Sequence, residues 1–195
     1  SPTSRPVSFR NSGSDGTRAT RRYVYDLHQR LCKTIEPESG ATVQAYDAAG
    51  NLAWRASGLD LPGPACDHTS VPGVRKIGYG YDERDRLKTT THGDGSPTVS
   101  RTYTADGLPR TLASAGLTWT YAHNKRRLLI SETLKTPAAS ETIAWDIDAH
   151  GHAGAITYPD GDKLAYAPNA LGEPSRVGSY ATQASWHPNG QLAAY

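Results

Sequence analysis

Hydrophobic residues alternate with polar ones in many short segments of the chain, and bends rich in glycine or aspartate separate these segments. Alternating sets include Ile77, Tyr79 and Tyr81; Leu117, Trp119 and Tyr121; and Ile143, Trp145 and Ile147. A period of two with aromatic and β-branched residues is typical of half-buried β-strands. Glycine, proline or β-branched residues interrupt every candidate helical period. The pattern therefore predicts an all-β chain with little helix.

A short unit recurs at the bends. It consists of an aromatic residue, often aspartate, two or three polar residues, frequently glycine, then a small or basic residue and leucine. The clearest copies span residues 25–31, 46–52 and 81–87. Further copies, more degenerate, begin at Tyr103, Tyr121, Ile147, Pro168 and Trp186. Eight imperfect copies at a mean spacing of about 23 residues indicate a repeat architecture.

Each unit is expected to be the turn of a β-hairpin. The aspartate side chain can accept hydrogen bonds from backbone N–H groups ahead of it, and the glycine supplies the positive φ that closes the loop. The aromatic residue and the leucine flank the turn and are expected to meet across the two strands. The structural repeat positions are Tyr25, Asp26, Leu31, Tyr46, Asp47, Gly50, Leu52, Tyr81, Asp82, Leu87, Tyr103, Gly107, Tyr121, Gly151, Trp186, Gly190 and Leu192.

Two segments depart from this rhythm. Residues 1–20 are rich in serine, threonine, arginine and glycine, and we expect them to form a linker or flexible arm, with residues 21–195 forming the repeat domain. Residues 58–74 form an insertion rich in proline and glycine in the longest gap between units. This insertion predicts a surface loop, and such loops often carry functional variation on a constant scaffold.

The unit at 46–52 resembles the YD repeat of the Rhs superfamily. The stretch 158–161, Tyr-Pro-Asp-Gly, followed by Tyr166, is similar to one that such repeats often carry. The resemblance covers roughly residues 22–195. Members include bacterial Rhs polymorphic toxins, the BC component of insecticidal Tc toxins, wall-associated toxins and teneurins. The resemblance implies an all-β fold in which antiparallel hairpin repeats form a curved or spiralling sheet, here part of a YD-repeat shell.

The resemblance implies a non-catalytic scaffold, part of a shell that encapsulates and helps deliver a toxin or effector polypeptide. The Asp-Pro-x-Gly-Leu motif of self-cleavage is not found in the sequence, so only the scaffold role carries over. The implied partners are the remainder of the shell, or another copy of the chain, and an enclosed effector. The implied location is secreted or at the cell surface, within a larger bacterial protein. The alternative is a surface-exposed adhesion module that binds carbohydrate or protein.

The composition of the chain argues against a membrane protein and against a protein that binds nucleic acid. The 195 residues include 36% hydrophobic and 21% charged ones, and no apolar run approaches the length of a membrane span. The 21 basic and 19 acidic residues give a net charge of +2, which disfavours binding of nucleic acid. The chain has no methionine and opens on Ser1, so we expect it to be a piece of a longer or processed polypeptide.

Candidate catalytic and metal-binding residues have simpler structural interpretations. His150 and His152 with Asp148 are the tightest metal candidate, but repeat histidines lie at polar turn positions where solvation suffices. Asp26, Asp47 and Asp82 occupy equivalent turn sites, whereas an active site needs one unique constellation. We therefore expect no enzyme, no cofactor and no metal.

The sequence leaves the roles of two sets of residues open, the two cysteines and the four tryptophans. Cys32 and Cys66 are too few for a disulfide framework, and neither their spacing nor their context argues for a bridge or settles its absence. Cys66 lies near His68, but in a proline-rich loop that argues against a catalytic pair. The four tryptophans could bind carbohydrate, although the alternating strands around Trp119 and Trp145 favour core packing.

Overall fold

The structure is a computed structural model that describes residues 4–7 and 20–195. Within these residues the chain is all-β, as the alternation predicts, and the one helical segment is the 3₁₀ turn η1 (Gly73–Arg75). The described part of the chain therefore contains no helix long and apolar enough to cross a membrane.

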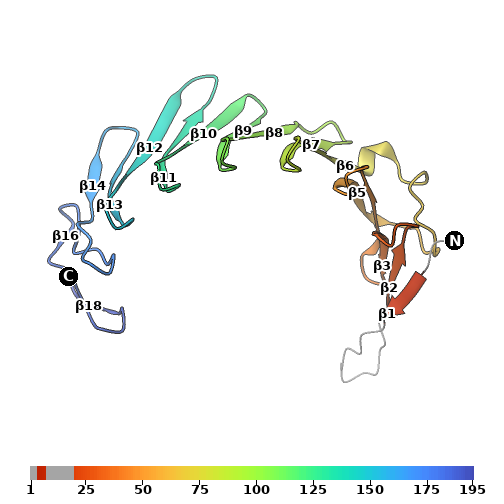
Figure 1. Ribbon diagram of the computed structural model, residues 1–195, viewed down its shortest axis with the longest axis horizontal. Coiled ribbons are helices and arrows are strands. Elements are labelled where there is room, and N and C mark those ends of the chain that lie inside the picture. Colours follow the sequence, from red (N-terminus) through yellow and green to blue (C-terminus); the bar gives the residue numbers. More distant parts are fainter. Residues whose placement is uncertain (1–3, 8–19) are drawn as a thin grey trace. The chain divides into compact units, whose positions relative to one another are not determined.

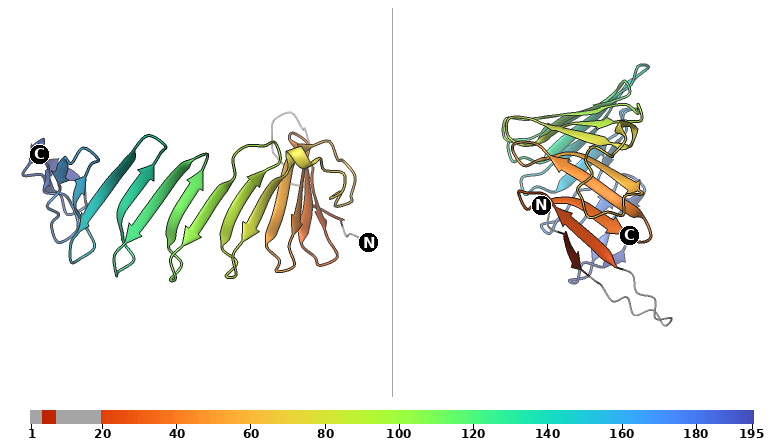
Figure 2. Two further views of the ribbon diagram at one scale, coloured as in Figure 1. Left: turned by 90° about the horizontal axis from the view of Figure 1, so that it is seen from above. Right: turned by 90° about the vertical axis from the view of Figure 1, so that its right-hand side faces the viewer.

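Fourteen strands form one antiparallel sheet in which the spatial order follows the sequence (Figures 1 and 2). The strands are β1 (Ser4–Val7), β2 (Arg21–Tyr25), β3 (Leu31–Glu36), β4 (Gly40–Tyr46), β5 (Leu52–Leu59), β6 (Ile77–Tyr81), β7 (Leu87–His92), β8 (Val99–Tyr103), β9 (Pro109–Ser114), β10 (Leu117–His123), β11 (Leu129–Lys135), β12 (Ser140–Ile147), β13 (Ala153–Thr157) and β14 (Lys163–Ala165). Two small sheets follow, which pair β15 (Arg176–Val177) with β16 (Ala181–Thr182) and β17 (Ser185–Trp186) with β18 (Leu192–Ala194). The large sheet is not closed, and the expected class of antiparallel hairpin repeats is confirmed.

Residues 4–7 belong to the segment that we expected to be a linker. They form the edge strand β1, which pairs with β2 in the register Arg5↔Tyr23 and Val7↔Arg21. Pro6 is compatible with this position because an edge strand tolerates a residue that has no N–H to donate. Residues 1–3 and 8–19 of the expected linker lie outside the described residues.

Contacts divide the chain into two compact units, Ser1–Ser100 and Arg101–Tyr195. The first unit contains the most deeply buried apolar cluster, formed by Ala41 and Val43 on β4, Ala56 and Leu59 on β5, and Val71 from the insertion. The second unit is a single layer in which each strand from β9 to β14 makes its main contacts with its sheet neighbours. Its described residues include one buried hydrophobic side chain, Ala155.

Candidate functional site

Nine turns of the described chain share one backbone hydrogen-bond pattern. Each turn spans seven residues. The N–H of its second residue donates to the carbonyl of its sixth residue, and the N–H of its fifth residue donates to the carbonyl of its second residue. We call each such segment a repeat turn. The repeat turns are residues 25–31, 46–52, 81–87, 103–109, 123–129, 147–153, 157–163, 168–174 and 186–192.

The fifth residue of every repeat turn has a positive φ. It is glycine in six turns, among them Gly50 at 92° and Gly107 at 92°, and Gln29, Asp85 and Arg127 take the same conformation in the other three. A left-handed residue after a type I turn creates a bulge that lets the strands continue in register. The strand pairing shifts register at this point in six of the repeat turns.

In seven of the nine repeat turns the side chain of the second residue accepts hydrogen bonds from backbone N–H groups of the turn. Oδ1 of Asp26 accepts hydrogen bonds from the backbone N–H groups of His28 and Arg30, each at 2.9 Å. Oδ1 of Asp82 does the same for Arg84 at 2.9 Å and Arg86 at 3.1 Å. These carboxylates therefore have the structural role that the sequence suggests for the repeated aspartates.

Arginine at the sixth position gives two of these turns an ion pair. Nε of Arg30 lies 2.9 Å from Oδ2 of Asp26, and Nη2 of Arg86 lies 2.7 Å from Oδ2 of Asp82. The hydrogen bond from the Arg86 side chain is the main reason that the pKa of Asp82 falls to about 2. For Asp26, desolvation is the largest single influence and raises the pKa, but the hydrogen bonds from Arg30 and His28 outweigh it and the pKa is lowered.

Acid will therefore weaken the repeat turns. A carboxyl group whose pKa is lower in the folded chain stabilises the fold above its ordinary pKa of 3.8, and this contribution is lost as the pH falls through the folded value of about 2. Asparagine keeps the accepting Oδ1, as Asn124 does for Arg126 and Leu128 in another repeat turn. We expect Asp82→Asn to lower the urea midpoint at pH 7.

The pH profile separates this ion pair from a general packing defect. The gap in urea midpoint between wild type and Asp82→Asn should close as the pH falls from 4 to 2, because the wild-type carboxyl group is then protonated too. A gap that stays constant over this range would contradict the role given to the Asp82 charge.

In three repeat turns the side chain of the first residue donates a hydrogen bond to the preceding repeat turn. The hydroxyl of Tyr46 donates to the carbonyl of Leu31 at 2.9 Å, and that of Tyr81 donates to the carbonyl of Leu52 at 3.0 Å. Nε1 of Trp186 donates to the carbonyl of Pro174 at 2.8 Å. In each case the acceptor is the seventh residue of the previous repeat turn. The link needs a polar atom on the ring, which tyrosine and tryptophan supply and phenylalanine does not.

We expect Tyr81→Phe to lower the free energy of unfolding by about 1 kcal/mol, because the part-buried carbonyl of Leu52 loses its side-chain donor. Tyr79→Phe is a matched control on the same strand, since the Tyr79 hydroxyl donates no hydrogen bond within the described chain. Urea denaturation of both variants measures the difference. Equal losses for the two would contradict the link between turns.

The aromatic residue and the leucine of a unit are cross-strand partners. The register pairs Tyr25 with Leu31, Tyr46 with Leu52, Tyr81 with Leu87 and Trp186 with Leu192. Asp47 accepts from the N–H of Asn51, and the left-handed residues include Gly151 and Gly190. At Tyr103 the turn is closed by the hydroxyl of Thr104, which accepts from the N–H of Leu108.

Two repeat turns differ from the sequence-based prediction, one in its position and one in its presence. The unit placed at Tyr121 begins two residues later, so that His123 pairs with Leu129 and Tyr121 lies inside β10 opposite Glu132. Residues 157–163 form a further repeat turn, where the sequence showed only the Tyr-Pro-Asp-Gly stretch. The sequence did contain a signal for each turn. Asn124 stands at the second position of the turn 123–129, and Gly161 stands at the fifth position of the turn 157–163.

The insertion lies at the surface, as expected, and several of its residues are bound to the sheet. Cys66 forms a disulfide with Cys32 on β3, and the imidazole of His68 contacts the carbonyl of Gln44 on β4 at 3.0 Å. The ring of His68 also packs edge-on against Trp54 at 5.7 Å between centroids. This bridge is one that the sequence did not favour, because it depends on a tertiary contact between β3 and the insertion.

A buried lysine lies beside the disulfide. The side chain of Lys33 is 0% exposed, and its Nζ donates to the carbonyl of Gly63 at 2.9 Å and to Oδ2 of Asp67 at 2.5 Å. Both partners belong to the insertion. A buried ammonium is tolerated only when it is paired and hydrogen-bonded, so Lys33 requires the insertion in place.

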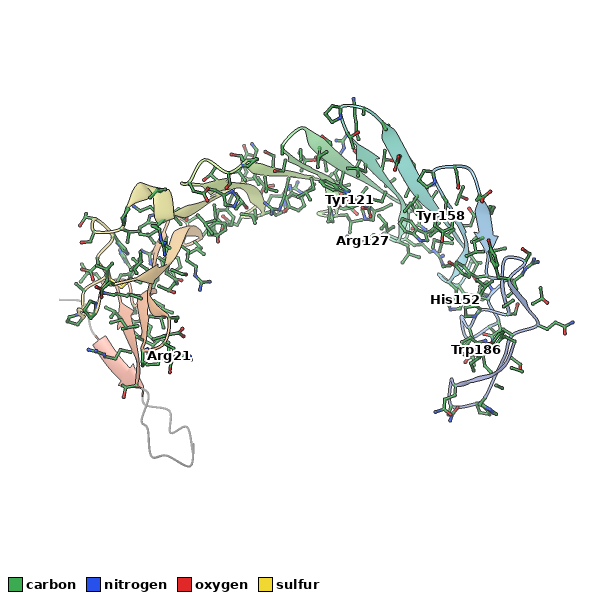
Figure 3. All side chains as sticks on the ribbon, turned by 180° about the vertical axis from the view of Figure 1, so that it is seen from behind. Arg21, Tyr121, Arg127, His152, Tyr158 and Trp186 are labelled. Atoms are coloured by element: carbon green, nitrogen blue, oxygen red, sulfur yellow. A yellow bond between two sulfur atoms is a disulfide. The ribbon has the colours of Figure 1, made fainter. Side chains whose placement is uncertain are left out.

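The sheet of the second unit has two different faces. Cross-strand register and the alternation of side chains place one group of large residues together, which we call the aromatic face. Its large apolar and aromatic residues are Leu112, Trp119, Tyr121, Leu134, Ile143, Trp145 and Ile156, and the same register places Glu132 and Glu141 on this face. Tyr121 is labelled in Figure 3. The apolar and aromatic side chains are half-buried by one another, and no second layer of described strands covers them, so Trp119 and Trp145 do not lie in a closed core.

Threonines dominate the opposite face. Thr111, Thr120, Thr133 and Thr142 are cross-strand neighbours on β9 to β12. The hydroxyls of Thr133 and Thr142 lie 2.8 Å apart, and Thr111 makes the same contact with Thr102 at 2.6 Å. On this threonine face (Thr102, Thr111, Thr120, Thr133 and Thr142), four of the five hydroxyls pair with one another, and the exposed Thr120 can bond water.

A shallow groove of about 410 Å³ opens where the aromatic face meets the repeat turns. Tyr103, Leu112, Tyr121, His123 and Leu129 contribute to its lining. Nδ1 of His123 is buried and has no hydrogen-bond partner among the described residues. The groove is mostly apolar, with few groups that could perform acid–base chemistry.

The sequence candidates for metal binding do not converge within the described residues. No group of three histidine, cysteine, aspartate or glutamate side chains there could hold an ion. The rings of His150 and His152 stack at 6.0 Å between centroids, and Oδ1 of Asp148 accepts three backbone N–H groups of its own turn. Cys66 is in the disulfide and does not present a thiol to His68.

No protein-family model and no curated protein matches the sequence. Solved structures with related geometry include crystal structures of TcdB2–TccC3. The TcdB2–TccC3–TEV structure is 12% identical with a TM-score of 0.49, over 85% of this chain and 11% of the other. The TcdB2–TccC3 structure without its hypervariable C-terminal region is 13% identical with a TM-score of 0.46, over 97% of this chain and 13% of the other.

The Photorhabdus luminescens Tc holotoxin pore is 14% identical with a TM-score of 0.43 over 97% of this chain. This chain spans 11–13% of the length of these structures.

Proposed function

We propose that this chain is a segment of a repeat shell that encloses a toxin or effector polypeptide, with the aromatic face toward the enclosed chain. The observation that carries the proposal is the combination of nine matching repeat turns with a single-layered sheet whose aromatic face has no cover among the described residues. Repeats of this kind extend by adding equivalent neighbours, and the face they build is continuous rather than a single pocket.

The two faces of the second unit support this orientation. Four of the five hydroxyls on the threonine face pair with one another, whereas the aromatic face presents Trp119, Tyr121 and Trp145 without a covering layer. These three rings are half-buried by their neighbours, and the apolar surface that remains uncovered is suited to contact with a partner. An extended apolar polypeptide is a suitable partner, because its side chains can contact rings spread over several strands without one defined pocket.

The scaffold is proposed to be non-catalytic and to act outside the cytosol as part of a larger bacterial protein. The Cys32–Cys66 disulfide supports the location, because such bonds persist in oxidising compartments and are rare in the cytosol. The partners in this proposal are the remaining repeats of the shell, or another copy of the chain, together with the enclosed polypeptide.

Site-specific photocrosslinking tests the orientation. The photoreactive residue p-benzoylphenylalanine replaces Trp119 in the longest natural polypeptide that contains this segment, and Thr120 on the same strand is the matched control. We expect crosslinks from position 119 to the enclosed polypeptide, and none from position 120. Mass spectrometry of the crosslinked peptides identifies the partner.

Three results would overturn the proposal. Crosslinks from position 120 alone would place the polypeptide on the threonine face. The absence of crosslinks from both positions would show that neither face contacts an enclosed polypeptide. Binding of glycans or of a separate protein at position 119 would favour the adhesion module instead.

A further inference from the structure

A second groove, of about 530 Å³, lies in the first unit at the strand ends away from the repeat turns. Arg55 on β5, Ile77 on β6 and His92 on β7 are cross-strand neighbours and therefore share one face there. Val74 and Arg75 from the η1 segment and Asp94 after β7 also line it, as does Lys76, whose ammonium lies over the ring of Trp54 at 4.1 Å. This volume lies within the range of small-molecule and peptide sites in proteins.

Positive charge exceeds negative charge in this groove. The guanidinium of Arg75 is held in place because Nη2 donates to the carbonyls of Ser57 at 2.8 Å and Gly58 at 3.1 Å. Arg55 is exposed, and its guanidinium forms no ion pair or hydrogen bond with a described residue. The one carboxylate, Asp94, accepts the N–H of Ser96 at 2.9 Å instead of pairing with either arginine.

The remaining walls combine apolar surface with an unused polar atom. Val74 is 58% exposed and Ile77 is 39% exposed, both high values for aliphatic side chains. Nδ1 of His92 is buried and has no hydrogen-bond partner among the described residues. A buried nitrogen of this kind is costly unless a ligand or water completes it.

We propose that this groove binds an extended polypeptide through an acidic side chain flanked by apolar residues. Arg55 and the free nitrogens of Arg75 receive the carboxylate, because a guanidinium presents paired N–H groups that match its two oxygens. Val74 and Ile77 pack against the flanking apolar side chains, and His92 hydrogen-bonds the bound peptide. The inference is independent of whether the aromatic face of the second unit encloses a chain.

Peptide titration of the full 195-residue chain tests this site. The probes are acetyl-Leu-Glu-Leu-amide, its glutamine counterpart and inorganic phosphate, with the NMR signals of the Ile77 methyl groups and the His92 ring as readout. We expect the glutamate peptide to shift both signals. The glutamine peptide should bind at least about tenfold more weakly, which is the scale of one charge-assisted hydrogen bond.

Matched variants localise the effect. Arg55→Gln should weaken binding of the glutamate peptide by about the same factor, since Arg55 has no structural partner to lose. Arg110→Gln removes an equally exposed arginine outside the groove and should leave binding unchanged. Equal binding of the two peptides, an unchanged affinity in Arg55→Gln, or phosphate binding as tight as that of the glutamate peptide would each overturn the proposal.

Discussion

Reduction of the Cys32–Cys66 disulfide will lower the free energy of unfolding of this chain by about 4 kcal/mol. The bond closes a loop over a sequence separation of 34, and constraining a loop of that size in the unfolded chain gives a stabilisation of about this magnitude. The effect is large because small domains have only about 5–15 kcal/mol of net stability in total. Urea denaturation with and without dithiothreitol measures the difference.

The double variant Cys32→Ala with Cys66→Ala serves as the control for reduction. It should unfold near the midpoint of the reduced wild type, and dithiothreitol should leave its midpoint unchanged. Hydrogen exchange should also accelerate around Val71 and Leu61 of the insertion, both of which pack in the cluster on β4 and β5. Without the disulfide the insertion has no covalent link to β3, so this packing opens more often. A wild-type midpoint that does not respond to reduction would contradict the stabilising role of the bridge.

The repeat turns could be predicted from sequence because their interactions are local. An aspartate that accepts N–H groups two and four residues ahead, and a glycine at the fifth position, are both visible within seven residues. The prediction lost its frame at Tyr121, because this turn begins with His123 rather than with an aromatic tyrosine or tryptophan. Tyr121 lies two residues earlier on the same face of β10 and was taken as the first residue of the unit in its place.

Features that depend on distant contacts could not be predicted in this way. The alternation of Leu31, Lys33 and Ile35 already places Lys33 on one face of β3 with two apolar residues. Nothing local to β3 shows that Gly63 and Asp67 reach this position, more than 25 residues later in the chain. The bridge to Cys66 was missed for the same reason, because it needs the path of the insertion over the sheet.

The aromatic face could be predicted from the sequence in part. The alternation around Trp119 and Trp145 correctly indicated that both side chains point to one side of half-buried strands. It could not show that no second layer covers them, because alternation reports the face of a strand and says nothing of what packs on it. The preference for core packing therefore overestimated their burial.

The insertion depends on the ion pair of Lys33 as well as on the disulfide. Asp67→Asn should lower the free energy of unfolding by about 3–5 kcal/mol, because it removes the charge that compensates a fully buried ammonium. Lys33→Met should cost much less, or nothing, since methionine fills a similar volume without a charge to desolvate. Two substitutions in the same contact are thus expected to differ strongly.

The double variant distinguishes a buried charge from ordinary packing. In the Lys33→Met background, Asp67→Asn should have little further effect, because no buried ammonium remains to be left without a partner. Urea denaturation of the wild type, the two single variants and the double variant gives the coupling between the two sites. Equal losses for the two single variants, adding fully in the double variant, would show that the charge of Lys33 is hydrated and that the insertion does not seal it from water.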